Sequence, residues 1–281
     1  MLSLLHLSDL HVGPSFLPEA GAAAQRLAHE LMPDGIVVSG DLTHRAKRQQ
    51  FADARSFLNQ LPTVPLIVVP GNHDVPLYRV TERFRNPLGL YREFIEARLI
   101  YTVRIGNAVI VALDSTSPRS AISNGRIHAS QLEFCADEFA KAPENAVRIV
   151  VAHHHFAPAP DYEWDRVILQ ARRAIDRFVD LKVDLILGGH LHRAYIGNTL
   201  DVYAGRHRDR GIIIVQCGTS TSHRGRGKER EKNSVNLVQT DAQTIRITHY
   251  IYFHDSDRFE PVSQHTFPRP GNRLPAQGPD P

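Results

Sequence analysis

A chain of 281 residues, 42% of them hydrophobic, is long enough to bury a full core. Its 33 basic and 30 acidic residues nearly balance, so net charge gives no reason to expect nucleic-acid binding. Two cysteines without CxxC spacing argue against a disulfide framework, and no apolar run is long enough for a signal peptide or a transmembrane segment. We therefore expect a cytoplasmic protein.

Short apolar runs alternate with amphipathic helical patterns through the first two thirds of the chain. In chain order, the expected strands are Leu2–Leu7, Gly35–Ser39, Leu66–Val69, Val109–Leu113, Val147–Ala152 and Val183–Leu187. The helices expected between them are Pro18–Leu31, Ala46–Leu61, Leu88–Arg98, Ala129–Lys141 and Asp165–Leu181. This alternation is typical of an α/β fold whose strands are buried on both faces.

After Gly188 the pattern changes to short strands joined by turns, which indicates a more antiparallel sheet. The strands expected there are Ala194–Ile196, Val202–Ala204, Ile212–Gln216, Ser234–Gln239 and Ile245–Tyr252. We expect a single domain over residues 1–259. Residues 260–281, rich in Pro, Gly and polar residues, predict a flexible C-terminal tail.

Side chains that can bind metals follow five of the expected strands. In chain order they are Asp9, His11, Asp41, Asn72, His153, His190 and His192. Because the carboxyl ends of strands in an open α/β sheet meet in one crevice, we expect the seven to converge. Oxygen and nitrogen ligands without sulfur suit Mn, Fe or Zn. Seven are too many for one ion, so the sequence predicts two divalent metal ions that share a carboxylate.

Each segment is weak evidence alone, since DxH, GD and GNHD also occur as turns or helix caps. The glycines at 40, 71, 188 and 189 allow sharp turns and close backbone approach beside these residues. We interpret His154 and His155 as packing or solvent-facing residues and not as ligands. Taken together, five such segments, each at a strand end, favour a metal site.

In this order, DLH, GD, GNHD, the His after a strand and GHLH resemble the signature of the calcineurin-like metallophosphoesterase superfamily, over Asp9–His192. The resemblance implies a four-layer α/β/β/α sandwich of two packed mixed sheets. It implies catalytic roles for His73 and for Asp74, which would orient His73. One metal would be held by Asp9, His11, Asp41 and His192, and the other by Asp41, Asn72, His153 and His190, with Asp41 bridging.

These residues suit hydrolysis of a phosphodiester by a metal-bridging hydroxide, with His73 as the general acid that protonates the leaving oxygen. Within the superfamily, VVAHHH and GGHLH most resemble the bacterial cyclic-nucleotide and glycerophosphodiester phosphodiesterase branch. A small soluble diester such as a cyclic nucleotide is therefore the expected substrate. Phe156 stands where that branch usually has Pro, so the substrate loop is expected to differ.

Three alternatives stay open. HLSDLHVG also resembles double-strand-break repair nucleases, and the basic loop 223–232 would help such an enzyme bind phosphates, although nucleic acid is the less favoured partner. The UDP-diacylglucosamine hydrolases are a second branch, but they generally have Arg where this chain has His73. Non-catalytic scaffolds of the superfamily have lost metal ligands, and none is missing here. The sequence also leaves open a homo-oligomer.

The loops 76–86, 115–127, 156–166 and 217–231 are expected around the mouth of the site. In the last of these, His223, Arg224 and Arg226 are candidates for binding a phosphate oxygen. Tyr162 or Trp164 would be able to stack on a base, although ordinary loop packing is the simpler interpretation.

Overall fold

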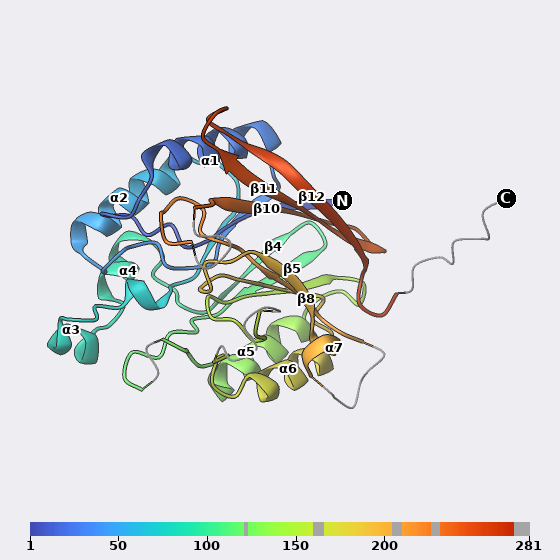
Figure 1. Cartoon of the computed structure of the whole chain (residues 1–281). Helices are drawn as coiled ribbons and strands as arrows, with labels where there is room; N and C mark the ends of the chain where they lie inside the picture. Colours follow the sequence, from blue (N-terminus) through green and yellow to red (C-terminus); the bar gives the residue numbers. More distant parts are fainter. Residues whose placement is uncertain (121–122, 160–165, 204–209, 226–230, 273–281) are drawn as a thin grey trace.

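The computed structural model describes residues 1–120, 123–159, 166–203, 210–225 and 231–272. Within these residues two six-stranded sheets face each other, and helices cover the outer face of each (Figure 1). The predicted four-layer α/β/β/α sandwich is therefore confirmed. Of the described helices, none combines the length and the apolar character needed to cross a bilayer.

The first sheet has the strand order β12-β11-β10-β1-β2-β3. Its strands are β1 (Leu2–Leu7), β2 (Gly35–Val38), β3 (Leu66–Val68), β10 (Ser234–Thr240), β11 (Thr244–Phe253) and β12 (Arg258–Pro268). Strands β1, β2 and β3 run parallel, whereas β10, β11 and β12 add antiparallel neighbours. The carboxyl ends of β1, β2 and β3 therefore lie at one edge of the sheet.

The second sheet has the order β4-β5-β6-β7-β9-β8. Its strands are β4 (Tyr101–Ile105), β5 (Ala108–Ala112), β6 (Val147–Val151), β7 (Leu185–Gly188), β8 (Tyr195–Asn198) and β9 (Ile213–Gln216). The four central strands are parallel, and β4 and β8 are antiparallel at the edges. Both sheets are mixed, as predicted.

The helices form the two outer layers. Between each layer of helices and its sheet lies a separate hydrophobic cluster. The first sheet is covered by α1 (Pro18–Leu31), α2 (Arg48–Asn59) and α4 (Gly89–Phe94), and the second by α5 (Ala129–Ala140) and α6 (Ala171–Asp180). Shorter elements are the 3₁₀ turn Asn72–Asp74, α3 (Val80–Arg85) and α7 (Thr199–Val202).

Burial on both faces explains the continuous apolar runs of the central strands. In β1, Leu5 and Leu7 belong to the cluster under α1 and α2, whereas Leu4 belongs to the cluster between the sheets. Ile110 and Ile149 meet that central cluster from the second sheet. A strand between two apolar layers needs no polar face, so its sequence shows no alternation.

The structure corrects the prediction of a flexible tail from Glu260, because β12 continues to Pro268. This is an edge strand paired with β11 alone, and most of its side chains are exposed and polar, so its sequence looks like a tail. Pro261 is tolerated at such an edge, next to an irregularity in the pairing. Residues 273–281 of the expected tail lie outside the described residues.

Two further differences concern short elements. The expected strand Val202–Ala204 is wrong, because Thr199–Val202 forms α7, whose first turn is capped by the Asn198 side chain. Ala204 lies outside the described residues. The edge strand β4 was not expected, because its polar residues Thr102 and Arg104 interrupt the apolar pattern.

A buried carboxylate joins the two sheets at the amino end of β7. Asp184 accepts hydrogen bonds from the backbone N–H of Arg148 at 2.9 Å, from Arg210 Nη2 at 3.0 Å and from Arg269 Nη2 at 3.1 Å. Arg269 follows β12 and also donates to the Asn145 carbonyl at 2.9 Å. The chain after β12 is thereby fixed to the second sheet.

Candidate metal centre

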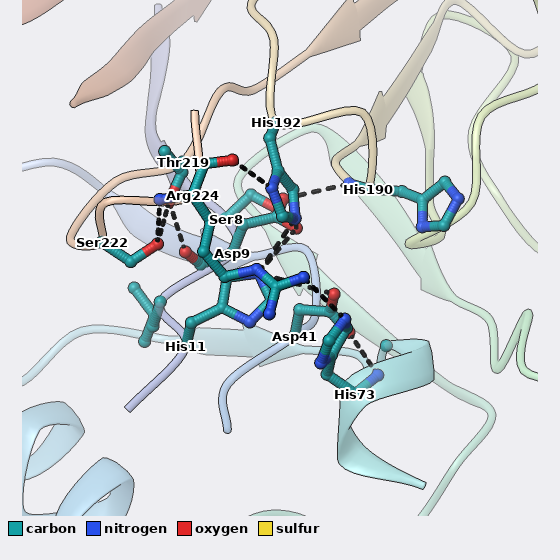
Figure 2. A network of polar contacts seen from close by, with 12 residues as sticks. Ser8, Asp9, His11, Asp41, His73, His190, His192, Thr219, Ser222 and Arg224 are labelled. Atoms are coloured by element: carbon teal, nitrogen blue, oxygen red, sulfur yellow. Dashed lines mark hydrogen bonds and ion pairs between the residues drawn. The ribbon is translucent and has the colours of Figure 1, made fainter. Parts of the chain in front are cut away.

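The seven side chains predicted as metal ligands lie together at the carboxyl ends of strands from both sheets. Figure 2 shows Asp9, His11, Asp41 and His192 pointing toward one another, with His190 beside them. In the first sheet they follow β1 (Asp9, His11), β2 (Asp41) and β3 (Asn72), and in the second sheet β6 (His153) and β7 (His190, His192). The crevice predicted from the strand ends therefore exists.

One group of ligand atoms comes from Asp9, His11, Asp41 and His192, and all of these atoms lie within 4.8 Å of one another. Asp9 Oδ2 accepts hydrogen bonds from Ser8 Oγ at 2.6 Å and from the His190 N–H at 3.0 Å. Asp9 Oδ1 is 3.1 Å from His192 Nε2, is buried and has no hydrogen-bond partner. A buried carboxylate oxygen without a donor fits a cation.

The second group is centred on Asn72 Oδ1, which lies 2.9 Å from His190 Nδ1 and 3.2 Å from His153 Nε2. Asp41 stands between the two groups. Its Oδ1 is 3.4 Å from His153 Nε2, and its Oδ2 is 3.7 Å from His11 Nε2. Asp41 Oδ2 is also buried without a hydrogen-bond partner. One carboxylate thus faces both groups, as a bridging ligand must.

Backbone carbonyls fix the orientation of two of the imidazoles. His153 Nδ1 donates to the Ser39 carbonyl at 2.8 Å, and His192 Nδ1 donates to the Arg224 carbonyl at 2.5 Å. In each ring the Nε2 lone pair is therefore aimed into the cluster. Histidine ligands of metals are usually held in this way, by a hydrogen bond from the other ring nitrogen.

The backbone at the site is held in a conformation that side chains other than glycine rarely adopt. Five of the seven residues have positive φ: Asp9 (53°), His11 (50°), Asp41 (52°), His190 (74°) and His192 (52°). The left-handed region costs an L residue about 1–2 kcal/mol. Hydrogen bonds such as Asp9 N–H to the Gly40 carbonyl (3.0 Å) hold these loops in place. Such strain concentrates at functional sites.

At two positions beside the site, Gly40 and Gly71, neighbouring side chains approach the backbone so closely that only glycine fits, as the sequence predicts. A Cβ on Gly71 would lie 2.2 Å from Asp41 Oδ1, and a Cβ on Gly40 would lie 2.6 Å from His153 Nδ1. Both distances are too short for any side chain. The two glycines therefore allow Asn72 and His153, which belong to the second group, to approach Asp41.

The electrostatics of the cluster keep its carboxylates ionised. Burial raises the pKa of Asp9 and of Asp41, but the neighbouring imidazoles outweigh it, so both pKa values lie well below the usual range. Burial lowers the pKa of His11 to about 4, which leaves a neutral ligand. Burial acts in the same direction on His153, but the Asp41 carboxylate raises its pKa to about 9. The two ionised carboxylates supply the negative charges of the cluster, and the neighbouring imidazoles respond to them.

His73 lies beside the first group, with its ring centroid 4.8 Å from that of His11. Its orientation does not come from Asp74, so that prediction is wrong. His73 Nδ1 donates to the His44 carbonyl at 2.9 Å. The buried Asp74 carboxylate accepts instead from the N–H groups of Gly71 and Thr43, both at 2.9 Å. Asp74 fastens the loops after β2 and β3 to each other.

Arg224 completes the wall of the cavity on the His73 side. Its Nη2 is 3.3 Å from His73 Nε2, and its Nη1 is 3.5 Å from His44 Nδ1. The cavity has a volume of about 410 Å³ and is lined by Asp41, Asn72, His73, His190, Leu191, His192, Arg224 and Gly225. Of the other residues expected near the substrate, His223 is exposed, and Tyr162, Trp164 and Arg226 lie outside the described residues.

Several residues of the site were not expected from the sequence. His154, which the sequence predicts to be a packing or solvent-facing residue and not a ligand, is buried, and a ligand atom of its ring lies within 4.8 Å of those of His153 and His190. Its Nδ1 is 2.8 Å from Ser115 Oγ, and its buried Nε2 has no hydrogen-bond partner. Thr219 Oγ1 donates to the Asp9 carbonyl at 2.8 Å. The dense hydroxyl run TSTS after β9 is the sequence signal that would have indicated this support.

The sequence matches the calcineurin-like phosphoesterase family over residues 2–194, more than half of the chain. The clustered carboxylates and imidazoles are compatible with a dinuclear metal site. The chain belongs to the calcineurin-like phosphoesterase family. No curated protein matches the sequence significantly.

Solved structures share the fold at low sequence identity. Purple acid phosphatase PPD1 from yellow lupin is 15% identical with a TM-score of 0.72, and the match covers 95% of this chain and 54% of the phosphatase. This chain thus spans about half of the phosphatase. PhoD is 13% identical with a TM-score of 0.68, covering 99% of this chain and 72% of PhoD. A dimetal phosphatase from Danio rerio is 11% identical with a TM-score of 0.63, covering 95% and 99%.

Proposed function

We propose that the protein hydrolyses phosphodiesters with two divalent cations, Mn, Fe or Zn, and that its substrate is a small soluble diester. The observation that carries this proposal is the position of Asp41, whose two oxygens face separate groups of ligand atoms. The two buried carboxylate oxygens without donors, on Asp9 and Asp41, support cations at these positions.

In this proposal Asp9, His11, Asp41 and His192 hold one cation, and Asp41, Asn72, His153 and His190 hold the other. Bound cations would supply charge neutralisation at the phosphoryl oxygens and would lower the pKa of a water. Asn72 is a neutral ligand, so it leaves its cation more electrophilic than a carboxylate would. Arg224 lines the same cavity and offers guanidinium N–H donors to a phosphoryl oxygen.

Turnover of a diester and a monoester by the Mn²⁺-loaded protein tests the reaction class. We expect hydrolysis of bis(p-nitrophenyl) phosphate to exceed hydrolysis of p-nitrophenyl phosphate, because the proposed substrate is a diester and the monoester has no second ester group. The measurement is kcat/KM for each, with and without EDTA. A protein that hydrolyses neither, or that keeps its activity in EDTA, would not be the proposed enzyme.

A change of His73 to Ala tests its role as the general acid. His73 Nε2 faces the cavity because Nδ1 is committed to the His44 carbonyl. Loss of a general acid typically costs about 10²–10⁴-fold when the leaving group is a poor one. We therefore expect a loss of that order on a diester with an alkoxide leaving group, and a much smaller loss with p-nitrophenolate, which leaves without protonation.

The comparison of the two leaving groups within one variant separates the acid role from misfolding, which would reduce both rates equally. An equal loss on both substrates, or full activity on the alkoxide diester, would contradict the role of His73.

A further inference from the structure

Three cationic side chains lie near His44, beside the first group of ligand atoms: Arg45, Lys47 and Arg224. Arg224 approaches His44 Nδ1 at 3.5 Å and His73 Nε2 at 3.3 Å. Burial lowers the pKa of His44, and the positive charges of Arg224 and Arg45 act in the same direction. Arg45 follows His44 directly in the chain, and His73, which lines the cavity, donates from Nδ1 to the His44 carbonyl at 2.9 Å, so this segment lies beside the cavity wall. We call these three side chains the cationic surface; Arg224 lines the cavity, and Lys47 is exposed.

None of these three cations is paired with a carboxylate among the described residues. Five other surface arginines do form such pairs, in Arg26–Asp257, Arg48–Glu93, Arg79–Glu82, Arg98–Glu96 and Arg258–Glu30. The first turn of α2, which follows Lys47, contains no acidic residue either. The Asp41 and Asp9 carboxylates act on Arg224, whereas Arg45 and Lys47 lack a paired carboxylate, so an anion bound beside those two would be stabilised.

An aromatic ring continues the cationic surface. The Arg45 guanidinium lies 5.2 Å from the ring centroid of Tyr78, whose side chain is 75% exposed. The neighbouring Arg79 donates to the Ala46 carbonyl at 2.6 Å, which ties the Tyr78 segment to the loop that carries Arg45. An exposed ring held against a guanidinium offers a surface for stacking as well as charge.

From this continuity we propose that the substrate is a phosphodiester with a second phosphate group on its leaving-group side, and that Arg45 and Lys47 bind this second phosphate. The inference rests on the proposed function, because His73 defines the leaving-group side. Arg224 lines the cavity together with Asp41 and is placed at the scissile phosphate. Arg45 and Lys47 belong to the segment after His44, which His73 contacts, and Lys47 is exposed, so we place the next phosphate of the same molecule at this segment.

Substrates with one phosphate use only part of this surface. A cyclic nucleotide or bis(p-nitrophenyl) phosphate would contact the two groups of ligand atoms and Arg224. It has no second phosphate that Arg45 and Lys47 could bind. The charge that selects the substrate is local, since the whole chain has 33 basic and 30 acidic residues. A diester with two phosphates should therefore bind better than one with a single phosphate.

Three thymidine dinucleotides test the proposal with the full chain loaded with Mn²⁺. TpT has only the scissile phosphate, whereas pTpT and TpTp each add a terminal phosphate at opposite ends. We expect kcat/KM for one of these two to exceed that for TpT by about tenfold, as two exposed charge contacts imply. In the double variant Arg45→Gln/Lys47→Gln this ratio should fall to about one. The double variant Arg26→Gln/Arg258→Gln removes the same charge from α1 and β12, and it should keep the ratio.

Each comparison is a ratio within one protein, so a general loss of folding or metal does not change it. The proposal is overturned if neither pTpT nor TpTp is hydrolysed faster than TpT, or if the advantage survives in the Arg45/Lys47 double variant. Failure of the proposed function would look different, because neither the three dinucleotides nor bis(p-nitrophenyl) phosphate would then be hydrolysed in a Mn²⁺-dependent way.

Discussion

Replacing Asp41 by Asn should reduce kcat/KM on a diester by on the order of 10³-fold or more. The amide keeps the size of the carboxylate and can still accept the His73 N–H bond, which is 2.7 Å long in the parent protein. It loses the negative charge and the second oxygen that face both groups of ligand atoms. We therefore expect metal analysis to show about one bound ion or fewer per chain, against an expected two for the parent protein.

A matched control is Asp114→Asn. Asp114 also follows a strand, β5, and burial raises its pKa to about 6. Its carboxylate accepts from the Thr116 N–H at 2.8 Å, a bond that Asn can also accept, and it belongs to neither group of ligand atoms. This variant should keep its metal content. If Asp41→Asn still bound two ions and retained its turnover, Asp41 would not be the bridging residue.

Replacing Asp184 by Ala should lower the free energy of unfolding by about 3 kcal/mol. The carboxylate is fully buried and accepts from Arg210 and Arg269, whose side chains are only 20% and 11% exposed. Its removal leaves two guanidinium groups largely buried without a counterion, which costs far more than the net stabilisation by the intact cluster. Urea denaturation followed by circular dichroism measures the difference.

The contrasting variant is Glu93→Ala, which breaks the ion pair with Arg48. Both side chains of that pair are well exposed, at 49% and 62%, so water screens the interaction and stability should change little. Equal stability losses in the two variants would show that burial of Asp184 does not control its contribution.

Much of the fold was predictable where local chemistry and packing agree. Helix α1 has the predicted bounds because Pro18 stands in its first turn and its small residues form one buried face. Strand β12 was missed because its stability comes from pairing with β11 along its whole length, not from an apolar face. Backbone hydrogen bonds form with almost any side chain, so they leave no pattern in the sequence. A polar edge strand is therefore predicted as a flexible tail.

The candidate site could be predicted as a set of residues but not as a set of contacts. Each expected ligand follows a strand, so the topology alone brings Asp9, Asp41 and His153 together. The partners of His73 and Asp74 could not be read in the same way. One contact uses the backbone carbonyl of His44, and the other uses backbone N–H groups, which every residue type carries. The grouping of Arg45, Lys47 and Arg224 likewise depends on loops that are distant in sequence.

The proposed ligands of each cation come from both sheets, and this arrangement links metal affinity to assembly of the whole sandwich. Asp9, Asp41 and Asn72 belong to the first sheet, whereas His153 and His192 belong to the second. A chain in which only one sheet has formed would present an incomplete set of ligands for each cation, with correspondingly weak affinity. The free energy of metal binding would therefore stabilise only the state in which both sheets are packed together, and the ions would oppose separation of the two sheets.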